Sequence, residues 1–404
     1  MTRKGVWGIQ GVRDKYLQSL WVDSYNAFGW GHNEEGEAGT APWNQDQSSP
    51  TTIGETSGVA LAKLGTAGTG GILIESSGKM RAWGKNSYGQ LGFNDKSDRN
   101  GAYPIPGTTV QWDDVSVGGK DANCDYVLAT RLDGTLWAWG RNQSGQLGQN
   151  EAGNPAQYSS PVQVGTETTW GGPRAMAVAQ NAVAVIKSDG TLWSWGYNGR
   201  SNLGHNSQTN RSSPVQVPGT TWSNVSMGFG MTLATRTDGT LWTWGLAAGN
   251  TRLGLGNANS YSSPKQIGTD TDWKTGMGGI TTNGNVSAAV KTSGELYIWG
   301  KNEGGQLGLN QATNYPNETL LQAPTQLPGS WSKAFQGYYH FLAIKGDGTL
   351  WSWGYGTKGQ LGGGFKEHKS SPVQASAETD WHQAMGVVTQ TSCGLRANLT
   401  PAQL

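Results

Sequence analysis

The stretch RLDGTLWAWGRNQSGQLG, residues 131–148, decides the fold because its parts return at near-even spacing along the 404-residue chain. Its second half runs from a tryptophan-glycine pair to another glycine nine residues after the tryptophan. Related segments, one of them a residue longer, begin at Trp30, Trp83, Trp139, Trp195, Trp244, Trp299 and Trp353. Successive starts lie 49–56 residues apart, a period typical of propellers and solenoids. The sequence therefore predicts one closed unit built from repeats.

Each period contains the pattern of a propeller blade. An apolar run, an Asp-Gly pair and an aromatic run, as in residues 131–140, predict a β-hairpin with a type I′ turn. A segment such as SSPVQV at 159–164 follows, and its proline places it at a sheet edge because proline cannot donate to a ladder. A further strand is expected around TTW at 168–170. Four short strands per period make one blade.

Three motifs together resemble the repeats of the regulator of chromosome condensation family. They are W-G-x-N-x-x-G-Q-L-G, D-G-T-L-W and S-S-P-V-Q-V, and the resemblance covers about residues 27–397. It implies a seven-bladed β-propeller, which agrees with the seven tryptophan-glycine starts. We therefore expect an all-β fold with an N-terminal arm, residues 1–26, and a single propeller, residues 27–404.

The two ends of the chain carry complementary parts of one blade. Residues 380–399 supply the early strands without a following LWxWG strand, and residues 27–31 supply such a strand without its hairpin partner. We expect them to pair in one mixed blade, which would remove an exposed sheet edge.

Composition excludes several classes of protein. A formal net charge of +1 provides no basic field for nucleic acid. The N-terminus lacks the apolar stretch of a secretory leader, and no run is long enough for a membrane span. We expect synthesis in the cytoplasm without a leader and no membrane insertion. The two cysteines, Cys124 and Cys393, are expected to remain unbridged.

Most of the 20 tryptophans recur with the repeat and are expected to pack between blades. Trp7, Trp21 and Trp43 do not recur. The first two lie in the arm, whose charges leave a local excess of two positives. The arm either folds over its own propeller or docks another chain, and both alternatives remain open. The candidate partner-binding residues are Arg3, Lys4, Trp7, Arg13, Tyr16, Trp21, Trp43, Tyr103 and Tyr315.

Sequence motifs that resemble catalytic or cofactor-binding sites are explained by the repeat and its turns. Gly354, Gly356 and Gly359 spell G-x-G-x-x-G but belong to a repeat copy without the following helix of a nucleotide site. The recurrent aspartates, such as Asp133, are predicted to serve Asp-Gly turns. The five histidines lack metal-ligand spacing, and the acidic loop at 94–98 lacks the glycine and glutamate of a calcium loop. We expect no enzyme, cofactor or metal.

Three functions remain as hypotheses. The leading one is a non-enzymatic, protein-binding propeller that forms a structural, decoration or attachment component of a virus (phage) particle, with capsid or tail subunits or a host surface receptor as partners. It reconciles a surface poor in Lys and Glu with the absence of a leader, and it places the protein in the virion, otherwise in the cytoplasm. The first alternative is a lectin-like module that binds glycans through Trp43, Tyr103 and Tyr315.

The second alternative is an exchange-factor-like regulator of a small GTPase. The best-known member of the family that this chain resembles is a nucleotide exchange factor for a small nuclear GTPase and binds chromatin. It uses a wedge-like insertion and a basic tail. The short periods here leave no room for a wedge, and the histidine expected before the hairpin survives at His340 alone.

Overall fold

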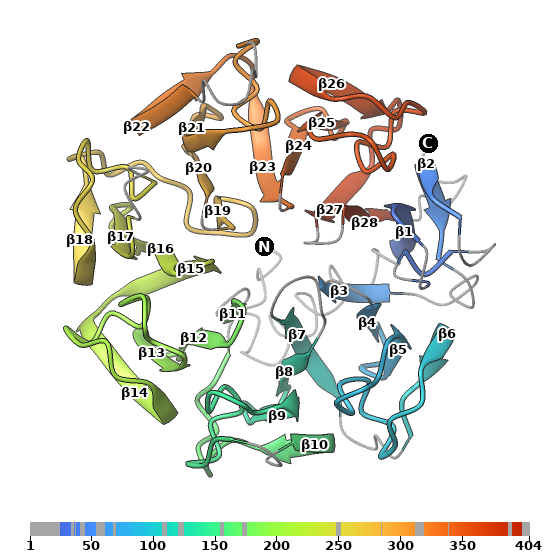
Figure 1. Cartoon of the computed structure of the whole chain (residues 1–404), viewed down its shortest axis with the longest axis vertical. Helices are drawn as coiled ribbons and strands as arrows, with labels where there is room; N and C mark the ends of the chain where they lie inside the picture. The colour runs from blue at the N-terminus through green and yellow to red at the C-terminus, as the bar shows by residue number, and fades with distance from the viewer. Residues whose placement is uncertain are drawn as a thin grey trace, which may run out of the picture.

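The chain forms a closed ring of seven four-stranded antiparallel blades around a central axis (Figure 1). The computed structural model describes residues 25–33, 36, 38–40, 45–53, 61–67, 70–106, 111–119, 125–153, 157–171, 176–247, 252–283, 285–311, 319–337, 339–386 and 390–397. Within these residues every regular element is a strand. The predicted seven-bladed propeller is confirmed.

The strands follow each other from the centre of the ring to its outside. Blade 1 holds β3 (Leu61–Ala67), β4 (Gly70–Glu75), β5 (Met80–Gly84) and β6 (Arg99–Pro104). Blade 2 holds β7 (Trp112–Gly118), β8 (Tyr126–Arg131), β9 (Leu136–Arg141) and β10 (Gln157–Gln163). Blade 3 holds β11 (Met176–Val178), β12 (Ala182–Ile186), β13 (Thr191–Gly196) and β14 (Arg211–Thr220).

The same order continues around the ring. Blade 4 holds β15 (Trp222–Gly228), β16 (Met231–Arg236), β17 (Leu241–Gly245) and β18 (Tyr261–Ile267). Blade 5 holds β19 (Ile280–Thr282), β20 (Val286–Val290), β21 (Leu296–Asn302) and β22 (Thr319–Leu327). Blade 6 holds β23 (Trp331–Gln336), β24 (His340–Lys345), β25 (Leu350–Gly354) and β26 (Lys369–Ser376). The proline segments form the outer strands, as predicted.

Blade 7 is built from both ends of the chain. Its inner strands are β27 (Trp381–Gly386) and β28 (Thr391–Ala397), and its outer strands are β1 (Tyr25–Gly31) and β2 (Gln47–Thr52). β1 pairs with β28 over its full length, from Tyr25 opposite Ala397 to Gly31 opposite Thr391. The expected mixed blade is therefore confirmed. A single pairing of Tyr25 with Leu61 connects this sheet to blade 1.

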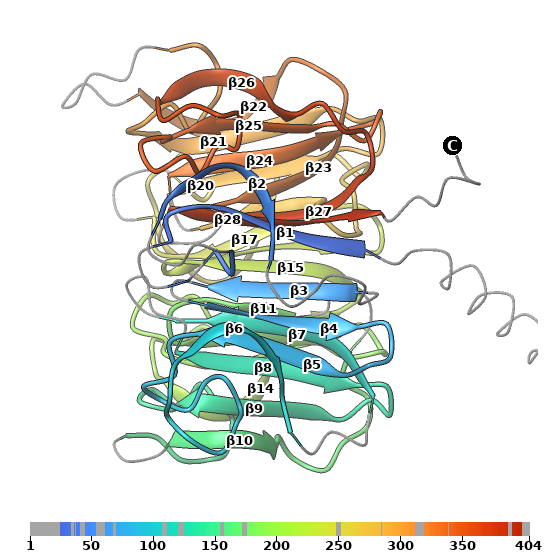
Figure 2. The same cartoon turned by 90° about the vertical axis from the view of Figure 1, so that its right-hand side faces the viewer.

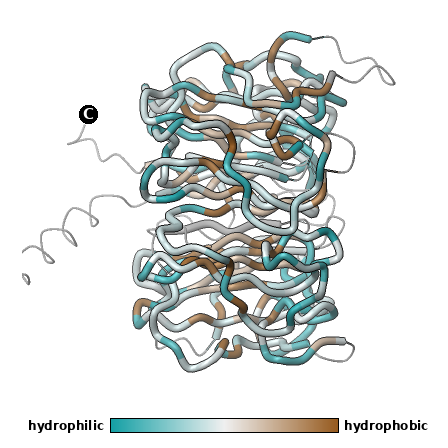
Figure 3. Tube along the Cα trace, turned by 90° about the vertical axis from the view of Figure 1, so that its left-hand side faces the viewer, coloured by the Kyte–Doolittle hydropathy of each residue, from teal (hydrophilic) through white to brown (hydrophobic). Residues whose placement is uncertain are grey.

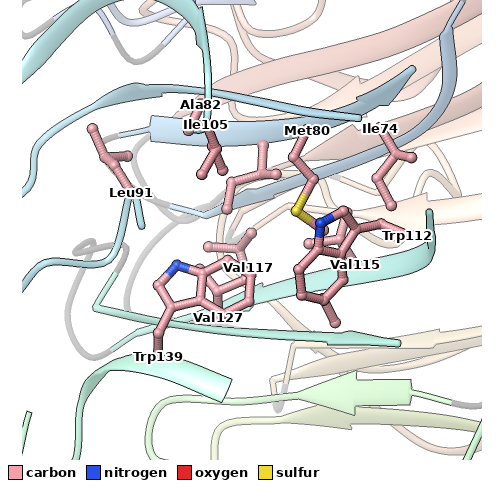
Figure 4. Packing of buried hydrophobic residues seen from close by; sticks show 12 residues of the cluster. Ile74, Met80, Ala82, Leu91, Ile105, Trp112, Val115, Val117, Val127 and Trp139 are labelled. Atoms are coloured by element: carbon pink, nitrogen blue, oxygen red, sulfur yellow. The ribbon is translucent and has the colours of Figure 1, made fainter. Parts of the chain in front are cut away.

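The core lies between neighbouring blades. One cluster combines Ile74, Met80 and Ile105 of blade 1 with Trp112 and Trp139 of blade 2, all at most 5% exposed (Figure 4). Equivalent clusters join the next blades in turn. Hydrophobic segments alternate with hydrophilic loops along the trace (Figure 3). Burial of aromatic and branched side chains between blades is therefore the main stabilising term.

The tryptophan-glycine motif ties each blade to its neighbour. All seven motif tryptophans are fully buried. The indole Nε1 of Trp139 donates to the backbone oxygen of Gln90 in blade 1 at 2.8 Å, and Trp195 donates to Gln146 of blade 2 at 2.9 Å. Four further copies make the same bond at 2.9–3.0 Å. The closing glycine leaves room for this indole, because a Cβ on Gly148 would lie 3.0 Å from Nε1 of Trp195.

The hairpin turn differs from the predicted type. Gly134 N donates to Arg131 O, and Arg131 N donates to Thr135 O. Only Gly134 has positive φ, +79°, while Leu132 and Asp133 do not. The turn is thus a type I turn followed by a glycine bulge, and the type I′ prediction was wrong. The glycine alone takes the left-handed conformation, which explains why Asp precedes it without strain.

Candidate functional site: a groove on the W-G face

The two faces of the disc carry different loops. In an antiparallel blade, successive connections emerge on opposite faces. We call the face that carries the tryptophan-glycine loops, for example residues 139–148, the W-G face. The opposite face carries the Asp-Gly turns, for example residues 131–135, and we call it the Asp-Gly face. The paired ends Tyr25 and Ala397 lie on the Asp-Gly side, and a side view separates the faces (Figure 2).

The Asp-Gly face uses its polar groups internally. Asp133 Oδ1 accepts from Thr135 N at 2.9 Å and from Thr135 Oγ1 at 2.6 Å, and Trp137 Nε1 donates to Thr135 Oγ1 at 2.8 Å. The hydrogen bonds from Thr135 lower the pKa of the Asp133 carboxyl. Three other blades repeat the chain around Thr191, Thr240 and Thr349. The aspartates therefore serve the turns, as predicted.

The same face places a cation between two aromatic rings in most blades. Arg131 lies 4.6 Å from the ring centre of Trp112 and 3.7 Å from that of Trp137. The corresponding cations of the other blades are Lys187, Arg236, Lys291, Lys345 and Arg396. Such contacts contribute about 0.5–2 kcal/mol each. Their regular recurrence identifies them as part of the scaffold.

The W-G face contains a groove that crosses three blades. Its volume is about 460 Å³. It is lined by Gln143 and Ser144 of blade 2, Gln180, Asn181, Tyr197, Arg200 and Asn210 of blade 3, and Phe229 of blade 4. Each of these residues belongs to a loop or strand end, so the rigid blades position a variable lining. The volume lies in the range of ordinary ligand pockets.

Arg200 is held in place at the groove. Its guanidinium carbon lies 3.2 Å from the ring centre of Phe229. Gly230, with φ +78°, makes room for the arginine stem, because a Cβ there would lie 2.4 Å from Arg200 Cδ. Tyr197, which is 40% exposed, borders the groove, and its hydroxyl lies where a Cβ on Gly199 would stand. Gly230 and Gly199 therefore permit the close approach of the Arg200 stem and of the Tyr197 ring.

A second guanidinium lies beside the groove. Arg252 is 3% exposed and donates from Nε to Leu246 O at 3.1 Å and from Nη1 to Asn285 Oδ1 at 3.1 Å. Burial, and then the charge of Arg200, lower the pKa of Arg252 to about 10. Arg252 therefore remains cationic at neutral pH.

The buried titratable groups elsewhere are closed to solvent. His340 Nε2 lies 2.8 Å from Ser392 Oγ, and burial lowers the pKa of His340 to about 3. Ser392 Oγ donates to Gln360 O, so it is occupied as a donor. Burial raises the pKa of the Cys393 thiol to about 12. His340 and Ser392 meet between blades 6 and 7, and Cys393 packs between blades 7 and 1, so none of them lines the groove.

The loops of the other motifs are also satisfied internally. Gly356, central in G-x-G-x-x-G, donates to His368 Nδ1, and a Cβ there would lie 1.8 Å from Glu367 O. Asp95 pairs with Arg99 at 2.7 Å, and Asp98 accepts from Asn86 N. In the described part of the chain, no three His, Cys, Asp or Glu side chains gather as a metal site requires. The same residues contain no helix that is long and apolar enough to cross a membrane.

Most of the partner-binding candidates from the sequence lie outside the described residues. These are Arg3, Lys4, Trp7, Arg13, Tyr16, Trp21, Trp43 and Tyr315. Tyr103 lies in β6, is 39% exposed, and donates to Asn100 Oδ1 at 3.2 Å. Of the aromatic set expected for glycan binding, the structure therefore places Tyr103 alone.

The groove residues were not predicted from the sequence. Arg200 and Ser201 stand in the motif copy WGYNGRSNLG, where Ser201 replaces the glycine of other copies and keeps the positive φ, +62°. Phe229 stands between two glycines in a loop. These departures from the repeat are visible in the sequence, but the contact between Arg200 and Phe229 is seen only in the folded structure.

Comparisons with known proteins agree with this architecture. The model of the regulator of chromosome condensation (RCC1) repeat matches residues 133–179, 189–234, 293–344 and 347–397. The Arabidopsis thaliana ultraviolet-B receptor UVR8 is 28% identical over 353 residues, which cover 85% of this chain and 76% of the receptor. The probable E3 ubiquitin-protein ligase HERC4 of Rattus norvegicus is 28% identical over 213 residues, 52% of this chain and 19% of the ligase.

A solved structure extends the likeness to the whole fold. Prp20p from Saccharomyces cerevisiae, described with its binding properties to Gsp1p and histones, superposes with a TM-score of 0.78. The alignment covers 95% of this chain and 93% of Prp20p at 18% identity, so it supports the fold and not a shared partner. Repeat motifs, blade number and these matches agree, and the chain belongs to the regulator of chromosome condensation repeat family.

Proposed function

We propose that the protein acts without catalysis as a protein-binding propeller, and that it binds its partner through the groove on the W-G face. The observation that carries the proposal is the groove itself, about 460 Å³ in volume and lined by residues of three blades. The exposed Tyr197, and Arg200 stacked on Phe229, are residue types enriched where proteins meet.

The likeness to Prp20p, whose description includes binding to Gsp1p and histones, is consistent with a protein-binding role. The relatives described above are a receptor, a ubiquitin ligase and Prp20p. They lend no support to the virus-particle hypothesis, which is therefore not part of the proposal. Docking by the N-terminal arm remains a prediction, and deletion of residues 2–22 tests it separately.

The proposed function is tested by site-specific photo-crosslinking in cells of the source organism. A photoreactive phenylalanine analogue replaces Tyr197 in one variant and Leu132 in the matched control. Leu132 is 64% exposed and lies on the Asp-Gly face, so both probes reach solvent from opposite sides. We expect one protein to be captured through Tyr197 and not through Leu132.

The captured protein must then bind in purified form. Tyr197→Ala and Phe229→Ala should each weaken binding about tenfold or more, the range of a central contact residue. Thermal unfolding of each variant shows whether the blades remain folded. A purified partner that binds both variants as tightly as the unmodified protein would refute the proposal.

The two alternatives are tested in parallel. Acceleration of nucleotide release from a purified small GTPase would favour the exchange-factor function. Binding to a glycan array that is lost in Tyr103→Ala would favour the lectin-like function. Either activity, found without any protein bound at the groove, would contradict the proposal.

A further inference from the structure

The charge in the groove selects the chemistry of its occupant. The eight lining residues include one charged side chain, Arg200, and no carboxylate. The charge of Arg200 also lowers the pKa of Arg252, so a second cation lies near the groove. The net charge of the lining residues is therefore positive, although the chain is nearly neutral.

The geometry of Arg200 suits hydrogen bonding to a carboxylate. Stacking on Phe229 covers the flat face of the guanidinium and fixes the plane of its edge donors. A carboxylate in that plane accepts paired, charge-assisted hydrogen bonds, which are stronger than neutral ones. The arginine stem packs against Gly230 in the space that a Cβ would fill, so little side-chain entropy is lost on binding.

The surrounding groups complete the recognition site. The amides of Gln143, Gln180, Asn181 and Asn210 line the groove and can both donate and accept. Tyr197 adds an exposed ring that can pack against an apolar neighbour of the acid. A nucleic acid needs a basic stripe that follows its backbone, and a single lining charge in a compact groove does not supply one.

We propose that the groove receives an acidic segment of the protein partner, a glutamate or aspartate next to an apolar or aromatic residue, and that Arg200 pairs with the carboxylate. The inference rests on the proposed function and adds the chemistry of the partner. It makes Arg200 a specificity-determining residue of the W-G face.

The experiment uses the full chain and fluorescence polarisation. The probe is a short fluorescein-labelled peptide with glutamates around one phenylalanine, and its counterpart has every glutamate replaced by glutamine. Arg200→Gln removes the charge and keeps the length, and Arg200→Lys keeps the charge without the planar fork. Arg99→Gln is the matched control, because Arg99 also lies over a ring, 4.5 Å from Phe93, but does not line the groove.

We expect Arg200→Gln to weaken binding of the acidic peptide about tenfold, or ~1.4 kcal/mol. Arg200→Lys should retain part of the affinity, and Arg99→Gln should leave it unchanged. The unmodified protein should bind the glutamine peptide about tenfold more weakly than the acidic peptide. Arg200→Gln should bind both peptides equally, because in a double-mutant cycle the two changes remove the same interaction. Thermal unfolding confirms that each variant is folded.

Several outcomes would overturn the inference. They are absence of binding by the acidic peptide, equal binding of both peptides, equal affinity in Arg200→Gln, or displacement of the peptide by single-stranded DNA at lower concentration. A partner captured through Tyr197 that binds Arg200→Gln normally would leave the proposed function standing and remove this inference alone. Failure to capture any partner would remove the proposed function as well.

Discussion

Trp139→Phe tests the hydrogen bond that joins blade 2 to blade 1. The substitution keeps an aromatic ring in the core but removes the Nε1 donor that bonds Gln90 O at 2.8 Å. Depriving a buried carbonyl of its donor costs about 1–3 kcal/mol. The smaller ring adds a void at a fully buried site, which costs about 1 kcal/mol more. We expect the free energy of unfolding to fall by about 2–4 kcal/mol.

Trp137→Phe is the matched control on the same strand. Trp137 is half-buried, and its Nε1 donates to Thr135 Oγ1 within its own hairpin at 2.8 Å. Loss of that bond should cost about 0.5–1.5 kcal/mol. Urea unfolding followed by far-ultraviolet circular dichroism measures both variants, since the loss of a tryptophan alters fluorescence directly. If Trp139→Phe is no more destabilising than Trp137→Phe, the blades are not coupled through the indole bond.

Further substitutions test the scaffold. Thr135→Val breaks the hydroxyl link to Trp137 and should cost about 1–2 kcal/mol in thermal unfolding; an unchanged melting temperature would count against the link. Gly148→Ala should cost about 2 kcal/mol or more in urea, because φ is +71° and a Cβ would press on the next indole. Gly256→Ala, at the same φ of +71° but with open space around it, should cost about 1 kcal/mol, and equal costs would refute the packing argument. His340 has a folded pKa of about 3, below the unfolded value of about 6.5, so its stabilising contribution is complete above pH ~6.5 and is lost as pH falls towards ~3. Relative to His340→Gln, the protein should lose about 2 kcal/mol between pH 7 and pH 5 in urea unfolding, and parallel losses in both proteins would show that His340 is not responsible.

The repeat made the fold predictable because each copy contains the residues that form its turn and its contacts with the neighbouring blade. Trp139 and its equivalents are buried in every blade, and the Asp-Gly pair marks the same turn each time. The closure of blade 7 followed from counting which strands each end lacked. The turn type did not follow, because it depends on the hydrogen bond from Gly134 to Arg131, and an Asp-Gly pair fits two hairpin geometries.

The groove was not predictable for a different reason. Its lining joins Gln143, Asn181 and Phe229, which are far apart in the sequence and meet only when three blades close side by side. No local pattern predicts such a meeting. Arg200 does depart from the repeat, but a departure gives no indication of the chemistry until its neighbour across the blade boundary is known.

The sixth residue of the tryptophan-glycine loop contacts the following blade on the W-G face. In blade 1 it is Tyr88, whose ring lies 4.8 Å from the guanidinium of Arg141 in blade 2. In blade 6 it is Lys358, which lies 3.5 Å from Asp46 of blade 7. In blade 3 it is Arg200, which crosses to Phe229 of blade 4.

The sixth position therefore crosses to the following blade in all three cases, while the buried tryptophans and glycines keep the backbone nearly constant. A change of side chain there alters the chemistry of the W-G face without disturbing the inter-blade bonds. In blade 6 Lys358 pairs with Asp46, whereas in blade 3 Arg200 lies over the ring of Phe229. The same scaffold position thus closes one blade boundary with an ion pair and another with a cation–π contact, and our proposal assigns acid recognition to the second.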